Sequence, residues 1–166
     1  MSELTLSMLP VGGGTLAIAS LPGRGGDYKG DMKAFGEFKP SLVMTMVTEA
    51  EIGLTGSASF GIDIQALGSR WFHLPVEDYG YPKGATVQQW VTASEAARAA
   101  LRGGGRVLVH CKGGCGRSGM AVLRLMVEMG EDPKQALERL RGLRPCAVET
   151  EEQLGWAAAG KSLNDS

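Results

Sequence analysis

The chain has 166 residues, enough for one domain with a substantial buried core. Its 17 basic and 18 acidic residues give a formal net charge of -1, a balance that gives no support for a nucleic-acid or membrane partner. No apolar run is long enough for a transmembrane helix, and the first residues lack the basic and apolar regions of a signal peptide.

Three cysteines stand at positions 111, 115 and 146, an odd number without the spacing of a secreted disulfide scaffold. This pattern favours a reducing compartment, and we expect a cytoplasmic protein. The 25 glycines are many for this length and indicate tight turns and close backbone approaches.

Short strand and helix patterns alternate along the first half of the chain. In chain order they predict a strand over 15–20, a helix over 31–38 capped by Asp31, a continuously apolar buried strand over 41–47, a helix over 60–68 ended by Gly68, and a strand over 70–76. Residues 77–85 are rich in Gly and Pro and predict a loop.

The second half continues the alternation. The patterns predict a helix opening at Thr86 with a T-x-x-Q capping box and ended by glycines 103–105, a strand over 106–110, a helix over 118–130, a helix capped by Asp132 with Pro133 at its first position, and a last helix from the capping box of Thr150 and Gln153 to about residue 162. We therefore expect one α/β domain over residues 1–166, with a mostly parallel central sheet flanked by helices.

The stretch RVLVHCKGGCGRSG (106–119) runs from a strand into a glycine-rich loop and matches parts of three phosphate-binding motifs. G-x-G-x-x-G is present, but it comes late in the chain, and Glu138, at the spacing of the expected acidic residue, lies in a predicted helix. A Walker A loop would need Gly at position 111, where the chain has Cys, and Lys where it has Arg117.

The third motif, C-x5-R, gives each residue a chemical task. Cys111 would end a strand and face the positive end of a helix, which favours the thiolate. The N–H groups of the loop can surround a phosphate, and Arg117 offers a planar pair of donors to two of its oxygens. A nucleophile and an anion site therefore coincide, as transfer of a phosphoryl group to sulfur requires.

The loop resembles the HCxxGxxR[ST] signature of the protein tyrosine phosphatase superfamily. PVEDYGYP (75–82) resembles the general-acid loop of dual-specificity phosphatases, most closely that of kinase-associated phosphatases, although Tyr79 replaces a residue that is often small there. Residues 140–153 and SLVMTMVTEAEI resemble further segments of the same proteins. The likeness covers most of residues 15–155, and we place the catalytic core at about 15–163.

The resemblance implies a cysteine-phosphatase fold and a set of site residues. Cys111 would attack phosphorus, Arg117 would hold its oxygens, and Asp78 would protonate the leaving oxygen and then act as base towards water. The phosphate-binding loop would consist of Lys112, Gly113, Gly114, Cys115, Gly116 and Arg117. Ser118 would bond the Cys111 sulfur, cap the following helix, or do both.

Other residues keep two interpretations. His110 is expected to orient the Cys111 backbone, and His73 to be structural. Gln153 either completes a capping box or, by the resemblance, positions the hydrolytic water. Lys112 and Arg144 add positive charge at the pocket or are surface cations. Glu77 and Asp63 are alternative general acids.

We expect a phosphatase acting on phosphotyrosine, phosphoserine and phosphothreonine in proteins, or on small phosphate esters, as a monomer without cofactor, metal, nucleic acid or membrane. His110, Cys111 and Cys115 lack the spacing of a zinc site. Cys115 or Cys146 could act as a resolving cysteine. The alternatives are a phosphate-binding pseudophosphatase that docks a phosphoprotein, and a thiol enzyme of the rhodanese or arsenate-reductase type.

Overall fold

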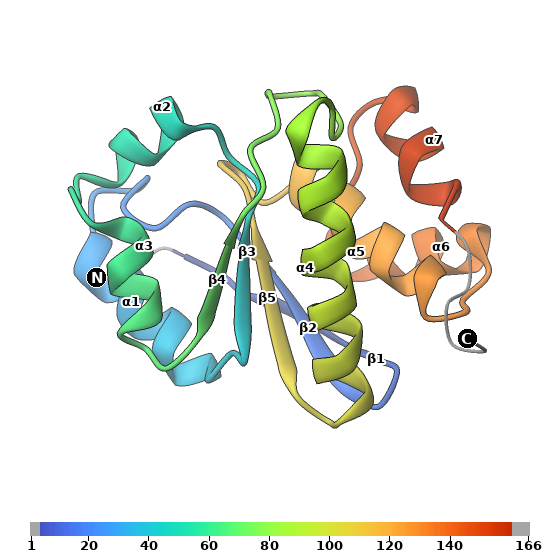
Figure 1. Cartoon of the computed structure of the whole chain (residues 1–166), viewed down its shortest axis with the longest axis horizontal. Coiled ribbons are helices and arrows are strands. Elements are labelled where there is room, and N and C mark those ends of the chain that lie inside the picture. The colour runs from blue at the N-terminus through green and yellow to red at the C-terminus, as the bar shows by residue number, and fades with distance from the viewer. Residues whose placement is uncertain (1–3, 161–166) are drawn as a thin grey trace.

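A computed structural model describes residues 4–160 of the chain (Figure 1). Five strands form one sheet in the order β1-β2-β5-β3-β4. They are β1 (Ser7–Val11), β2 (Gly14–Ala19), β3 (Leu42–Thr45), β4 (Arg70–His73) and β5 (Arg106–His110). Only β1 and β2 pair antiparallel, and the other three pairs are parallel. The predicted class, a single α/β domain with a mostly parallel sheet, is confirmed.

Helices cover both faces of the sheet (Figure 1). One face carries α1 (Tyr28–Phe38) and α3 (Phe60–Gln65), and the other carries α4 (Ala85–Arg102), α5 (Gly116–Glu128), α6 (Pro133–Leu143) and α7 (Glu151–Ala158). The short α2 (Glu49–Ile52) and a 3-10 turn (Gly53–Thr55) follow β3. None of the helices within residues 4–160 is both long and apolar enough to cross a bilayer.

The central strand β5 supplies side chains to both cores. Val107 and Val109 belong to the larger core beneath α4 and α5, whereas Leu108 belongs to the smaller core beneath α1 and α3. Successive side chains of a strand point to opposite faces, so a strand buried on both sides must be apolar throughout. Burial on both faces fixes the position of β5 in the sheet. It therefore also fixes the position of Cys111, which follows the last strand residue, His110.

Several element ends differ from the sequence prediction. The edge strand β1 was not predicted, because Pro10 weakens the strand pattern there. Asp27, not Asp31, caps α1, since its side chain accepts a hydrogen bond from Gly30 N. Asp31 lies inside the helix and accepts one from Gly23 N at 2.9 Å. The strand predicted over 70–76 ends at His73.

The start of α4 also differs. Gly84 is its N-cap, and Thr86 makes no capping bond; its hydroxyl donates to the Pro75 carbonyl at 2.8 Å instead. In contrast, the predicted cap at Asp132 and the capping box of Thr150 with Gln153 are both confirmed. The last helix ends at Ala158, and the part predicted beyond 160 lies outside the described residues.

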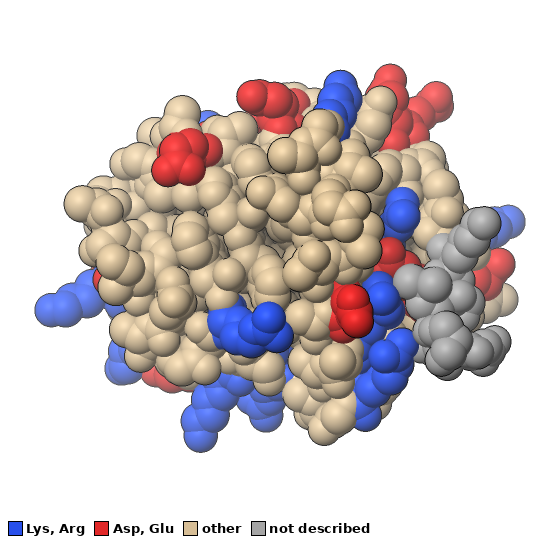
Figure 2. All heavy atoms as spheres, viewed as in Figure 1, with Lys and Arg blue, Asp and Glu red and all other residues tan. Residues whose placement is uncertain are grey.

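Charge is unevenly distributed over the surface in Figure 2. Acidic side chains gather along the upper edge of that view, over α2 and α7, whereas basic side chains gather along the lower edge. The first turns of α2 and α7 carry two glutamates each, namely Glu49, Glu51, Glu151 and Glu152. The edge of the sheet at which β3, β4 and β5 end is therefore bordered by negative charge.

Candidate active site

Residues 111–115 form the loop that joins β5 to α5, and α5 begins at Gly116 with Cys115 as its N-cap. Gly114 has a positive φ of 73°, and a Cβ there would clash with Arg144 and with the Ala19 backbone. Only glycine fits such a position without strain. The loop is also tied to the segment after β2, because Leu21 N donates to the Lys112 carbonyl at 3.0 Å.

His110 lies fully buried at the end of β5 and holds the next residue through a chain of hydrogen bonds. Trp71 Nε1 donates to Thr45 Oγ1 at 2.9 Å, so the single hydroxyl proton of Thr45 is free to go to His110 Nε2, 2.7 Å away. His110 Nδ1 then carries the ring proton and donates to the Cys111 carbonyl at 3.3 Å. Burial lowers the pKa of His110 to about 4, in keeping with this neutral tautomer.

Cys111 is a free, buried thiol whose sulfur lies 3.2 Å from the Ser118 hydroxyl. Ser118 is not the N-cap of α5, because the helix begins two residues earlier, at Gly116, and its N-cap is Cys115. Its hydroxyl is placed to donate to a sulfur that carries negative charge.

Arg117 is the largest fully buried side chain and is held from two sides. Glu51 binds it with both carboxylate oxygens, at 2.7 Å to Nη1 and 2.9 Å to Nη2, and the Val76 carbonyl accepts from Nη1 at 2.8 Å. Its Nε is buried and has no hydrogen-bond partner within residues 4–160. The bidentate pair fixes the plane of the guanidinium and leaves this donor available.

The Glu51–Arg117 pair shifts the pKa of both partners. The hydrogen bonds from Arg117 lower the pKa of Glu51 to about 2, although burial acts against this. Burial by itself would lower the pKa of Arg117, but Glu51, the Cys111 charge and Asp78 together raise it above its usual value. Both groups are therefore charged throughout the neutral range.

The loop after β4 carries two adjacent carboxylates that face different cavities. Asp78 Oδ1 lies 3.6 Å from Arg117 Nη2, and Asp78 lines a cavity together with Cys111. Glu77 lines a separate cavity with Lys83. Asp63, on α3, accepts hydrogen bonds from the Tyr28 and Ser57 hydroxyls. Of the three carboxylates considered as the acid, only Asp78 borders the cavity of Cys111.

This cavity is open and has a volume of about 270 Å³. Its lining comes from residues 111–117, from the loop of Asp78, from the segment after β2 and from the segment before α7. The lining residues are Arg24, Asp78, Tyr79, Cys111, Lys112, Gly113, Cys115, Gly116, Arg117 and Glu149. Both positive and negative groups therefore line this cavity.

Gln153 is fully buried, and both the oxygen and the nitrogen of its side-chain amide bind backbone groups. Its Oε1 accepts from Glu149 N at 2.8 Å and from Thr150 N at 3.3 Å, and its Nε2 donates to the Gly80 carbonyl at 3.0 Å. The capping interpretation is confirmed. The same side chain also ties the loop of Asp78 to the start of α7, a role that the sequence analysis did not predict.

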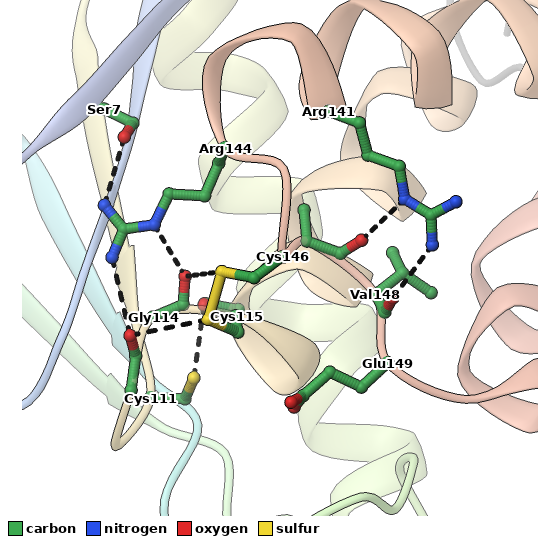
Figure 3. The surroundings of a disulfide bond; sticks show 12 residues. Ser7, Cys111, Gly114, Cys115, Arg141, Arg144, Cys146, Val148 and Glu149 are labelled. Atoms are coloured by element: carbon green, nitrogen blue, oxygen red, sulfur yellow. Dashed lines mark hydrogen bonds between the residues drawn. A yellow bond between two sulfur atoms is a disulfide. The ribbon is translucent and has the colours of Figure 1, made fainter.

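Residues 144–150, called the strap here, cross the back of the loop in Figure 3. Arg144 is neither a free surface cation nor a lining of the cavity. Its Nε donates to the Gly114 carbonyl at 2.9 Å, and its Nη1 donates to Thr5 O and Ser7 Oγ. Arg144 therefore clamps the loop to the N-terminal strand. Burial lowers its pKa below the usual value.

A disulfide joins Cys115 in the loop to Cys146 in the strap, with their Cα atoms 5.1 Å apart (Figure 3). Cys111 stays outside this pair. The cysteine count had given no reason to expect the bond, and the proposed resolving partners bind each other rather than the nucleophile candidate. Val148 N also donates to the Cys115 carbonyl at 3.3 Å, so the strap contacts the loop at backbone level as well.

A family model described as Swiss Army Knife protein, DSP-PTPase phosphatase domain, matches residues 43–155, which include the loop, Asp78, Glu51 and the strap. The chain belongs to this DSP-PTPase family. A search of curated proteins finds no match.

Solved structures of phosphatases have the same fold as this DSP-PTPase domain. Tk-PTP in its active form is 27% identical, with a TM-score of 0.68 over 85% of this chain and 87% of the other. A kinase-associated phosphatase with its catalytic-site cysteine changed to serine is 20% identical, with a TM-score of 0.79 over 95% and 93%. PTPMT1 in complex with PI(5)P is 19% identical, with a TM-score of 0.73 over 92% of each chain.

Sequence reasoning missed two carboxylates at the site. Glu51 had a usable signal, because T-x-x-E after the buried strand is a capping box, and Thr48 and Glu51 do cap α2. Glu149 had none, since a single glutamate between two helices is usually solvated. Its place beside the loop depends on how the strap is anchored, which involves residues far apart in the sequence.

Proposed function

We propose that this DSP-PTPase domain is a cysteine-dependent phosphatase that hydrolyses phosphate monoesters through a cysteinyl-phosphate intermediate. The observation that carries the proposal is that Cys111, Arg117 and Asp78 line one cavity. A nucleophile, an anion-binding cation and an acid are the three groups that this reaction needs.

In the proposed first step, Cys111 sulfur attacks phosphorus while Asp78 gives a proton to the leaving oxygen. Arg117 and the N–H groups of residues 112–117 hold the equatorial oxygens as negative charge develops on them. In the second step water releases phosphate, and the Ser118 hydroxyl stabilises the departing thiolate from 3.2 Å. Neither step requires a metal or an organic cofactor.

We further propose that the substrates are phosphotyrosine, phosphoserine and phosphothreonine in proteins, with the chain acting as a monomer in the cytoplasm and resembling kinase-associated phosphatases most closely in its acid loop. The acidic edge formed by α2 and α7 supports substrates with few additional phosphates, since a polyanion would be repelled. A reducing compartment would keep the Cys111 thiol in its reactive form, and it would also favour reduction of the Cys115–Cys146 disulfide.

Hydrolysis of p-nitrophenyl phosphate, with and without vanadate and EDTA, tests the proposal. We expect turnover that vanadate inhibits and EDTA leaves unchanged. Cys111→Ser should abolish turnover and keep phosphate-site binding, whereas Arg117→Ala should lose both, because its charge acts in the ground and transition states. Activity of Cys111→Ser within tenfold of the wild type would reject the mechanism. Vanadate binding without turnover in the wild type would favour the pseudophosphatase.

A further inference from the structure

The carboxylate of Glu149 stands at the wall of the cavity that contains Cys111 and Arg117. A Cβ added to Gly116, the first residue of α5, would clash with Glu149 Oε1 and would lie 3.1 Å from Glu149 Cδ. In Figure 3 the side chain extends from the strap towards Cys111, away from Arg141. Glu149 therefore presents a carboxylate to the space where a phosphoryl group on Cys111 would stand.

This carboxylate differs from the other glutamate of the site. Glu51 is bound by both Nη atoms of Arg117 and by the Thr48 backbone, which leaves it no role towards a ligand. Glu149 is fixed through its backbone N–H by Gln153, but its carboxylate has neither a hydrogen bond nor an ion pair with residues 4–160. Its backbone is held in place, and its exposed carboxylate remains available as a hydrogen-bond acceptor.

The position also has an electrostatic cost that indicates use. A carboxylate beside a phosphate site repels the bound dianion, and the positive N-terminus of α5 offsets only part of that repulsion. Gln153, the residue that the resemblance suggested for positioning water, uses both its amide groups on the protein backbone. Two carboxylates line the cavity and could accept a hydrogen bond from the hydrolytic water. Asp78 lies 3.6 Å from Arg117 Nη2, whereas Glu149 has no such cation beside it within residues 4–160.

We propose that Glu149 is the general base of the second half-reaction, which rests on the cysteinyl-phosphate mechanism proposed above. Glu149 accepts a hydrogen bond from the water and takes its proton as the water oxygen bonds to phosphorus. The phosphorus–sulfur bond breaks, its electron pair returns to Cys111 as thiolate, and inorganic phosphate leaves. Asp78 then serves the first half-reaction, so two carboxylates in different environments divide acid and base work.

Rapid mixing with p-nitrophenyl phosphate separates the two half-reactions. Glu149→Ala and Glu149→Gln are compared with Glu152→Gln, which removes the same charge from an exposed position in the first turn of α7. We expect both Glu149 variants to keep the rate of the nitrophenol burst within about twofold and to lose at least tenfold in steady-state kcat. kcat/KM should stay near the wild-type value, because it reports only the steps through phosphorylation of the enzyme.

Acid-quenched samples analysed by mass spectrometry should show one phosphoryl group on Cys111 accumulating in the Glu149 variants, and the Glu152 control should behave as wild type. Steady-state kcat unchanged in Glu149→Ala would overturn the assignment. So would equal losses in kcat and kcat/KM without accumulated phosphoenzyme, which would indicate a binding or structural role. A wild-type protein that forms no phosphoenzyme and releases no nitrophenol would instead reject the phosphatase mechanism itself.

Discussion

The loop of Asp78 and the strap border the same cavity, and each brings one carboxylate to its mouth, but they are held very differently. Asp78 has half of its side chain exposed, and within residues 4–160 its carboxylate forms an ion pair only with Arg117, at 3.6 Å. The strap is held by the Cys115–Cys146 disulfide, by Arg144, and by Arg141, whose guanidinium donates to the Ala147 and Val148 carbonyls.

This difference fits two separate chemical tasks. A proton donor must reach leaving groups of different size. The loop of Asp78 is held by hydrogen bonds to its Val76 and Gly80 carbonyls and has no covalent link to the rest of the site, so it can adjust this distance. A water that attacks a cysteinyl-phosphate always approaches along the same line, and a rigid wall can position it. The comparison predicts that changes to the loop affect the rate of phosphoryl transfer, whereas changes to the strap affect stability and hydrolysis of the intermediate.

The largest expected effect is that of Asp78→Asn. Without its proton, kcat for a phosphoserine peptide should fall by about 10²- to 10⁴-fold, the usual range for general acid catalysis. The effect on p-nitrophenyl phosphate should be smaller, because nitrophenolate leaves without a proton, and the basic limb of the pH–rate profile should flatten. Glu77→Gln is the matched control, since Glu77 lines a different cavity. The assignment moves to Glu77 if that variant, and not Asp78→Asn, shows these changes.

The second effect concerns the anchoring of the strap. The disulfide closes a segment with a sequence separation of 31, for which loop-closure entropy gives between about 3 and 4 kcal/mol. Cys146→Ser should lower the free energy of unfolding in urea by about this amount, and reduction of the wild type by dithiothreitol should have the same effect. Cys111→Ser should keep the sensitivity to dithiothreitol. Equal unfolding curves for wild type and Cys146→Ser would show that the strap does not depend on this bond.

The third effect concerns His110, which lies buried beneath the loop of Cys111. The pKa of His110 is lowered from 6.5 to about 4 by burial, so below pH 6.5 the unfolded chain binds a proton that the folded chain does not. The contribution of neutral His110 to the free energy of unfolding should therefore be fully present above pH 6.5. It should be lost as the pH falls towards 4, by about 3 kcal/mol in total.

Urea unfolding between pH 7 and pH 5 measures this decrease, because Glu51, whose pKa is lowered to about 2, loses its contribution only at lower pH. Thr45→Val removes the hydroxyl that holds the neutral ring and should raise the pKa of His110 in an NMR titration. A stability that is flat across this pH range would show that His110 is not kept neutral.

The smallest effect compares the backbones of the two regions, because each contains one non-glycine residue in the left-handed conformation. Tyr79 (φ 62°) is exposed, so Tyr79→Gly should relieve about 1 kcal/mol of strain without loss of packing. Val148 (φ 67°) is buried, so Val148→Gly should gain the same relief but lose about 1.5 to 3 kcal/mol of apolar burial, and the net result should be a small loss of stability. Urea unfolding of both variants measures the two changes in the free energy of unfolding. Equal changes would contradict the expected difference between the exposed and the buried position.

Local signals predicted the centre of the fold and of the site. The alternating strand and helix patterns, the H-C-x5-R-S loop and two of the helix caps all depend on residues close in sequence, and the structure places them as expected. Asp78 was singled out from Glu77 by pattern alone, and the two separate cavities support the same choice.

What could not be predicted depends on pairs far apart in the chain. Glu51 binds Arg117 across 66 positions, and Gln153 reaches Gly80 across 73. The disulfide follows from the strap lying against the loop, which cysteine spacing does not reveal. Thr86 was misread as a cap, because its hydroxyl has a better partner that only the folded chain brings near. Ser118 was left with two interpretations, and the folded chain brings its hydroxyl to the Cys111 sulfur.

Arg144 has a consequence for where the domain can be shortened. The family match begins at residue 43, and sequence reasoning placed the start of the core near residue 15. Yet Arg144 donates hydrogen bonds to the Thr5 carbonyl and the Ser7 hydroxyl as well as to the Gly114 carbonyl of the loop that follows Cys111. A truncated chain that starts at residue 15 would keep every proposed catalytic residue, yet lose the outer support of the clamp that holds their loop. Residues before the recognisable domain are thus part of its working unit, and deletion mapping should count them as such.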